Sequence, residues 1–187
     1  MLRRQPLQMH PSTTALIQAA IAEDIGPGDV TSEFFIPAES RSKANLVARE
    51  QGVMSGAEIA SMVFATIDPA TEVRVLVADG GPFEKGDTLM EISGSTRSLL
   101  SAERTALNFL QRLCGVATMT RRYVEAVKPH PVKVLDTRKT TPGWRLLAAT
   151  GPDSTGNAWL YAWNLLDLFV VLVIAFGFGK LWGWPWG

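Results

Sequence analysis

The chain contains 187 residues, of which 47% are hydrophobic and 19% are charged, enough to build a buried core in one large domain or two small ones. Lysine plus arginine equals aspartate plus glutamate, at 18 each, so the charge balance does not indicate nucleic acid or an acidic membrane as a partner. The single cysteine, Cys114, excludes an internal disulfide and is typical of a reducing compartment.

The first predicted elements are a flexible arm over residues 1–11 and a helix that follows it. Apolar residues then recur at helical spacing, with Ser12 or Thr13 as a suitable N-cap. Gly26 can close this helix because glycine readily adopts the backbone conformation of a C-cap.

An acidic, glycine-containing turn spans residues 23–31. Carboxylates beside glycines could form a metal or acid–base site. A helix C-cap followed by an Asp29 side chain that hydrogen-bonds its own turn is favoured over that interpretation.

The next segment indicates a small mixed α/β unit. Alternating residues predict strands over 43–49 and 71–78, and an amphipathic pattern predicts a helix over 56–67 between them. Residues 80–94 predict a turn, a hairpin and a strand. The hairpin is similar to those of biotinyl- and lipoyl-carrier folds, but Lys85 does not lie in a carrier context, so only the architecture is inferred.

The clearest predicted helix covers residues 98–113. Its apolar face consists of Leu99, Ala102, Ala106, Phe109, Leu110 and Leu113, and its polar face of Ser101, Arg104, Asn108 and Gln111. Gly115 is expected to interrupt the helix, and a second helix is expected over 116–127.

Residues 132–143 read VKVLDTRKTTPG, which predicts a short buried strand that opens into a basic loop before a Pro142-Gly143 turn. Arg138 offers a planar fork for a carboxylate or phosphate, and Lys139 adds a mobile charge. Taken alone, this pattern is also typical of a solvated turn.

Four separated motifs resemble one family. They are SAERTALNFLQ at 101–111, LDTRKTTPG at 135–143, the acidic turn at 23–31 and the hairpin at 80–94. Over about residues 12–147 the chain is similar to quinolinate phosphoribosyltransferase, also called carboxylating nicotinate-nucleotide pyrophosphorylase. The resemblance implies an α/β fold, with an N-terminal open-faced sandwich (hammerhead-like) domain at 12–114 and the start of an incomplete α/β barrel at 115–147.

The same resemblance implies a reaction. The family transfers the phosphoribosyl group from phosphoribosyl pyrophosphate to quinolinate with loss of carbon dioxide, giving nicotinate mononucleotide in NAD biosynthesis. Mg²⁺ would accompany the pyrophosphate, although its family ligands are not in this chain, and the working unit would be a homodimer or a multiple of one. A cytoplasmic location is also implied.

The resemblance also assigns substrate-binding residues. Arg138 and Lys139 would hold the two carboxylates of quinolinate, and Thr137 would orient them through hydrogen bonds. Arg104 would reach into the site of the neighbouring subunit. No catalytic residue and no metal ligand is assigned.

The composition changes after residue 147. Residues 148–157 are expected to form a polar joint, and residues 158–187 are hydrophobic and foreign to the family. A membrane-spanning helix through 158–182 is favoured over a buried helix, although Asp167 opposes it. This segment leaves a second function open, a non-catalytic, membrane-tethered dimerisation or binding module.

We expect the purified chain to form no nicotinate mononucleotide from quinolinate and phosphoribosyl pyrophosphate. The resemblance stops before the strands that carry the family's later lysine, its acidic magnesium ligands and its phosphate-binding glycine loops. A product assay on the 187-residue chain checks this expectation, and detection of the nucleotide would contradict it.

Overall fold

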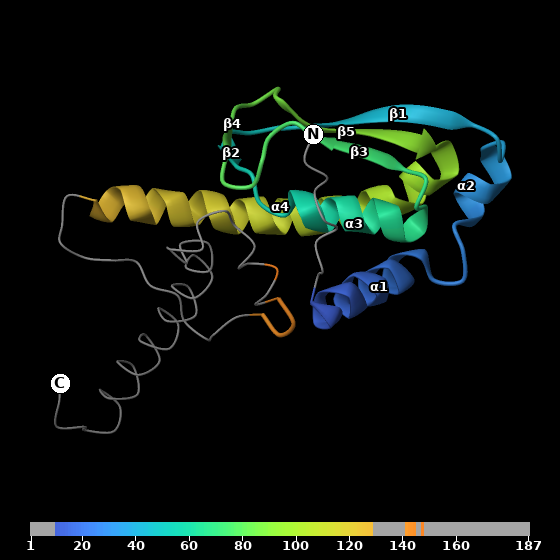
Figure 1. Ribbon diagram of the computed structural model, residues 1–187, viewed down its shortest axis with the longest axis horizontal. Helices are drawn as coiled ribbons and strands as arrows, with labels where there is room; N and C mark the ends of the chain where they lie inside the picture. The colour runs from blue at the N-terminus through green and yellow to red at the C-terminus, as the bar shows by residue number, and fades with distance from the viewer. Residues whose placement is uncertain (1–9, 129–140, 145–146, 148–187) are drawn as a thin grey trace, which may run out of the picture.

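The computed structural model describes residues 10–128, 141–144 and 147. A small antiparallel sheet lies on one side of two helices, and a third helix lies on the other side (Figure 1). In chain order the elements are α1 (Pro11–Ile25), α2 (Val30–Phe35), β1 (Arg41–Val47), β2 (Gly52–Val53), α3 (Ala57–Ile67), β3 (Glu72–Val75), β4 (Pro82–Phe83), β5 (Thr88–Ser95) and α4 (Thr96–Val127).

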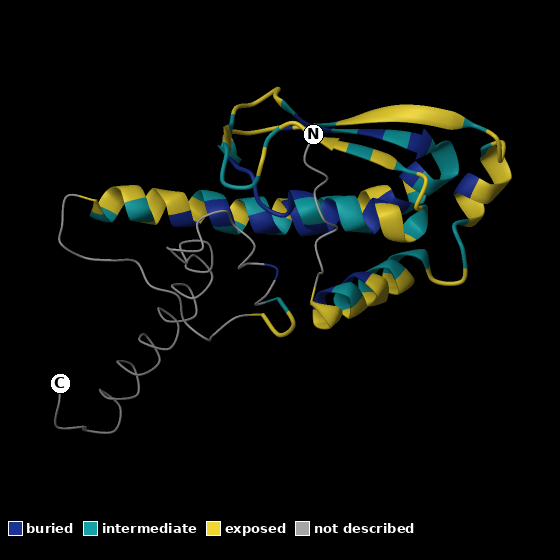
Figure 2. Ribbon diagram, viewed as in Figure 1, coloured by how far each residue is buried: buried dark blue, intermediate teal, exposed yellow. Residues whose placement is uncertain are grey.

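Strand β5 lies at the centre of a three-stranded sheet, with β1 and β3 as antiparallel neighbours on its two sides. Alternate residues of β5 face opposite sides of the sheet. Met90 and Ile92 are 0% and 2% exposed, whereas Glu91 receives a hydrogen bond from Arg74 at 3.2 Å on the other face. One face is therefore covered by helices and the other is open to solvent, which confirms the predicted open-faced α/β architecture (Figure 2).

The core lies between the sheet, α3 and α4. The predicted apolar face of α4 is buried as expected, at Leu99, Ala102, Ala106, Phe109, Leu110 and Leu113. Gly56 precedes α3 with a φ of +93°, and a Cβ added there would lie 2.5 Å from Leu113 Cδ1. The crossing of α3 and α4 therefore requires glycine at this position.

Helix α1 is capped at both ends, with one difference from the prediction. The N-cap is His10, whose Nδ1 accepts the Ser12 backbone N–H at 3.3 Å, rather than Ser12 or Thr13. Gly26 closes the helix as predicted, with a φ of 57° and its N–H donated to the Ala22 carbonyl at 3.0 Å.

Two further expectations were wrong. Helix α4 runs without a break through Gly115 for 32 residues, because Leu113 and Ala117 on either side are both buried and hold the helix against the core. The segment over 80–94 does not form a paired hairpin, since β4 pairs with β2 while β5 pairs with β1 and β3.

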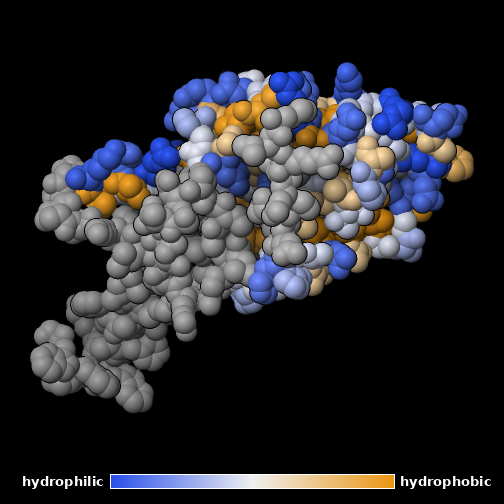
Figure 3. All heavy atoms as spheres, in the orientation of Figure 1, coloured by the Kyte–Doolittle hydropathy of each residue, from blue (hydrophilic) through white to orange (hydrophobic). Residues whose placement is uncertain are grey.

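Apolar side chains also reach the surface at α2. Val30, Phe34 and Phe35 of α2 are 71%, 81% and 73% exposed. Figure 3 shows that hydrophobic residues reach the surface elsewhere on this face too, among hydrophilic ones. Contiguous exposed apolar residues are typical of surfaces that contact another molecule.

Within the described part of the chain, no helix is long and apolar enough to cross a membrane. The predicted span through 158–182 lies outside the described residues, as do the joint over 148–157 and residues 1–9 of the predicted arm over 1–11. The arm prediction was wrong at its end, because His10 caps α1 and Pro11 begins it.

Replacing Gly115 by alanine should stabilise the fold. Gly115 is an exposed residue inside α4 with open space around it, and glycine inside a helix costs about 1 kcal/mol relative to alanine. The free energy of unfolding from denaturant titration measures the gain. Gly56→Ala is the control and should destabilise the fold, because its Cβ would clash with Leu113. A loss of stability in Gly115→Ala would contradict a continuous helix at this position and favour the predicted break.

Candidate functional site

The candidate site lies where α1 ends against the polar face of α4. Arg104 projects from α4, and its Nη1 donates a hydrogen bond to Asp24 Oδ1 in the last turn of α1 at 3.0 Å. The Arg104 side chain is 74% exposed, whereas that of Asp24 is only 20% exposed. The cation therefore faces solvent while its carboxylate partner is held within the fold.

The acidic turn binds α4 at a second point, one helical turn before Arg104. Asp29 caps α2, accepting the Ser32 backbone N–H at 3.1 Å and the Ser32 hydroxyl at 2.5 Å. Its Oδ2 also accepts the Ser101 hydroxyl at 3.0 Å. These hydrogen bonds, led by the Ser32 hydroxyl, lower the pKa of Asp29, with a further contribution from the charge of Arg104. The favoured sequence interpretation, Asp29 bonded to its own turn, is confirmed.

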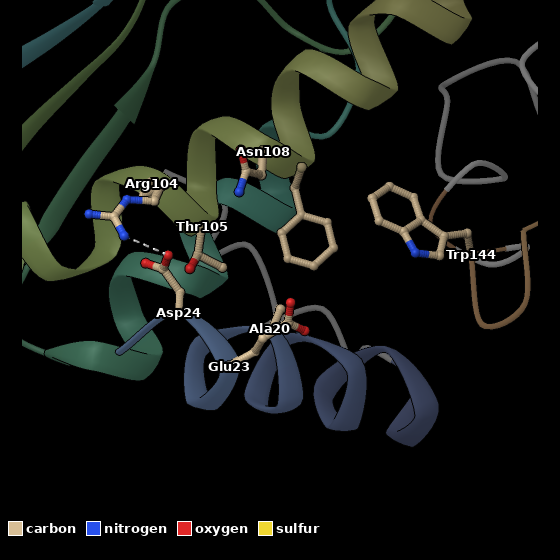
Figure 4. Close-up of a pocket in the computed structure, with 8 residues that line it drawn as sticks. Ala20, Glu23, Asp24, Arg104, Thr105, Asn108 and Trp144 are labelled. Carbon is tan, nitrogen blue, oxygen red and sulfur yellow. Dashed lines mark hydrogen bonds and ion pairs between the residues drawn. The ribbon is translucent and has the colours of Figure 1, made fainter. Parts of the chain in front are cut away.

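A pocket of about 400 Å³ opens beside this ion pair. Its lining residues come from α1, α4 and the segment after residue 140 (Figure 4), and they are Ala20, Glu23, Asp24, Arg104, Thr105, Asn108, Phe109 and Trp144. The pocket combines charged and amide groups at one end with an aromatic wall at the other. A small polar ring compound has both kinds of surface.

The aromatic wall is set by a tight turn. The Trp144 N–H donates to the Thr141 carbonyl at 3.0 Å, and Gly143 has a φ of +80°, which the third position of a type II turn requires. The predicted Pro142-Gly143 turn is therefore confirmed. It places the Trp144 ring 5.2 Å from that of Phe109, with the Arg112 guanidinium 5.9 Å from the indole centroid.

Among the predicted site residues, the structure places Arg104 at this pocket. Thr137, Arg138 and Lys139 lie outside the described residues. The polar-face prediction also included Asn108, which lines the same pocket. Sequence reasoning missed Asp24 as the partner of Arg104. One signal was present, since Glu23 and Asp24 place two carboxylates in the last turn of α1, the end of a helix that favours cations.

The pocket does not have the donor set of a magnesium site. No group of three or more His, Cys, Asp or Glu side chains that could hold a metal ion occurs among the described residues. Of the two pocket carboxylates, that of Asp24 is already bonded to Arg104.

The guanidinium of Arg104 is bonded to Asp24 on one side and is open on the other. An arginine fork binds a carboxylate through two parallel hydrogen bonds, and the exposed Nε–Nη2 edge of Arg104 makes no hydrogen bond with the described residues. The fold and site thus define an α/β protein with a small pocket at the end of α1, whose charged lining residues are Arg104, Glu23 and Asp24.

Comparison with known proteins identifies the family. The N-terminal domain model of quinolinate phosphoribosyl transferase matches residues 29–114, and the C-terminal domain model matches residues 116–161. The chain belongs to the quinolinate phosphoribosyltransferase family. The two matched ranges meet at Gly115, inside α4, and the second extends past residue 147, where the sequence resemblance was placed to end.

Individual relatives agree with this assignment. The chain is 40% identical over 141 residues to quinolinate phosphoribosyltransferase [decarboxylating] 1b of Nicotiana tabacum, covering 74% of this chain and 40% of that protein. It is 41% identical over 131 residues to a probable nicotinate-nucleotide pyrophosphorylase [carboxylating] of Synechocystis, covering 70% of this chain and 44% of that protein. The crystal structure of NadC from Streptococcus pyogenes matches with a TM-score of 0.71 and 38% identity, covering 76% of this chain and 51% of that one.

The chain therefore spans about half the length of the relatives it matches, or less. These comparisons give no support to the membrane-tethered binding module.

Removing the Asp29 carboxylate should destabilise the junction that carries Arg104. Asp29→Ala loses the α2 cap and the bond from Ser101, and loss of a cap costs about 1 kcal/mol of unfolding free energy. Because the folded-state pKa lies below the ordinary value of 3.8, this stabilisation is present above pH 3.8 and is lost as pH falls through the folded-state pKa. Urea titrations of both proteins across acidic pH measure it, and a difference that stays constant into strong acid would contradict the assignment.

Proposed function

We propose that this chain carries a quinolinate-binding part of the enzyme that transfers a phosphoribosyl group from phosphoribosyl pyrophosphate to quinolinate, with decarboxylation to nicotinate mononucleotide, and that the chain alone does not complete the reaction. The observation that supports this most directly is Arg104, which presents an open guanidinium edge at a pocket in a chain of this family. The curated relatives carry the names of that activity.

The charge of quinolinate explains why the proposed site contains cationic side chains. Quinolinate carries two adjacent carboxylates that repel each other, so a site must hold it with charge-assisted hydrogen bonds. By the family resemblance, Arg138 and Lys139 hold these carboxylates and Thr137 orients them. Loss of carbon dioxide leaves electron density on the pyridine ring, which a positively charged, partly dehydrated site stabilises.

The proposal includes a homodimer in which Arg104 of one protomer completes the site of the other. Two features of the described residues support it. Arg104 points outward, with 74% of its side chain exposed, as a residue donated to a partner must. The exposed apolar residues of α2 provide a surface suited to a second protein chain.

Mg²⁺ would enter with the pyrophosphate of the second substrate. The described residues offer no matching carboxylate cluster, so no step through the ion is derived from them.

A subunit-mixing experiment tests the shared site. Arg104→Ala and Arg138→Ala should each weaken quinolinate binding at least about tenfold, because each removes a charge-assisted bond to a carboxylate. When the two variants are coexpressed with different affinity tags, the purified mixed dimer has one intact site and should recover about half of the wild-type binding capacity. Isothermal titration calorimetry measures both affinity and capacity.

The control is Glu103→Gln, which changes an exposed charge on α4 outside the pocket and should bind like the wild type. Failure of the wild-type chain to bind quinolinate would contradict the proposed function. If the mixed dimer had no intact quinolinate site, Arg104 and Arg138 would serve the same protomer's site. That result would contradict the donation of Arg104 to the partner.

A further inference from the structure

The Arg104 guanidinium is held from one side only. Its Nη1 donates to Asp24 Oδ1 at 3.0 Å, and Figure 4 shows another guanidinium nitrogen pointing away from α1. An arginine has five N–H donors, and the hydrogen bond to Asp24 uses one of them. The Nε–Nη2 edge is the one that binds a carboxylate side-on, and this contact leaves it open.

Asp24 occupies a position in its helix that is unfavourable for a carboxylate. Carboxylates in the last turn of a helix face the partial negative charge of the helix end, which destabilises them. The last turn of α1 holds Glu23 and Asp24 and has no basic residue of its own. The compensating cation is Arg104, which is 80 residues away along the chain. A local rule broken beside a pocket is typical of a functional site.

The backbone that carries Asp24 is also held in place by contacts with the rest of the fold. Its helix is closed at Gly26 and buries Ile17 completely in the core. One turn before Arg104, Ser101 of α4 is bonded to Asp29 at 3.0 Å. The backbones that carry Asp24 and Arg104 are therefore locked together on both sides of the ion pair, and the carboxylate is mostly enclosed, at 20% exposure.

From this geometry we propose that Asp24 is the positioning residue for Arg104, holding the guanidinium so that its free edge meets a carboxylate of the pyridine substrate. The inference rests on the proposed function, which supplies that substrate. A free arginine side chain samples many rotamers, and an ion pair that restricts it before the ligand arrives reduces the entropy that binding must overcome. Asp24 touches Arg104 and acts through it.

The test measures quinolinate affinity by calorimetry in the complete chain. Asp24→Asn keeps the shape of the side chain but removes its charge, and should weaken quinolinate binding about tenfold. Asp24→Glu keeps the charge and should recover part of this loss. Glu103→Gln removes a neighbouring exposed carboxylate on α4, whereas the carboxylate that bonds Arg104 is that of Asp24, so this variant should leave the affinity unchanged.

A double variant separates positioning from folding. In an Arg104→Ala background, Asp24→Asn should cause no further loss of affinity, since the group it positions is gone. An equal loss in both backgrounds would mean that Asp24 acts on the fold rather than on Arg104, and would overturn the proposal. Tighter quinolinate binding by Asp24→Asn would also overturn it, because Asp24 would then compete with the substrate.

A measurement without ligand distinguishes a failure of the positioning role of Asp24 from a failure of the proposed function. The ¹⁵N NMR signal of the Arg104 Nε–H group should report an ordered side chain in the wild type and an averaged one in Asp24→Asn. Identical order in both proteins would overturn positioning by Asp24 and leave the proposed function standing. An ordered Arg104 in a wild-type chain that binds no quinolinate would overturn the proposed function and the substrate assigned here.

Discussion

Burial of one apolar face of α4 is the constraint on which the rest of the structure depends. That face covers the sheet and α3 through residues such as Ala102, Ala106 and Leu113, all 2% exposed or less. With this face fixed against the core, the polar face of the same helix must point away from it. The positions of Ser101 and Arg104 follow from this, since they lie one turn apart on the outward side and meet the acidic turn after α1.

The elements that sequence reasoning found are those whose pattern is local and long. The apolar face of α4, the closing glycine of α1 and the strand pattern around β1 all appear in short windows of sequence. Helix α2 was not anticipated, because six residues are too few to show helical periodicity and its cap, Asp29, was assigned only to a turn. The break expected at Gly115 failed because packing of Leu113 and Ala117 outweighs the weak helix propensity of one exposed glycine.

The residues of the candidate site also fall into those that the sequence predicted and those that it did not. Arg104 was found through a motif resemblance, and its exposure agrees with a role outside its own protomer's core. Its partner Asp24 was not found, because a contact between residues 80 positions apart leaves no periodic trace in a single sequence. The aromatic wall of Phe109 and Trp144 was missed for the same reason, although the turn that presents Trp144 was predicted from Pro142-Gly143.

The open face of the sheet has a consequence for the chain at high concentration. Among the described residues, strands β1 and β3 are the two edges of this sheet, and an unpaired edge can recruit a strand from another molecule and begin a fibre. The edges carry charged and polar side chains, including the exposed Lys43 on β1 and the Arg74–Glu91 pair beside β3. Charged side chains on an edge strand disfavour the addition of another strand, because like charges of two copies would then lie side by side, so these residues oppose edge-to-edge polymerisation.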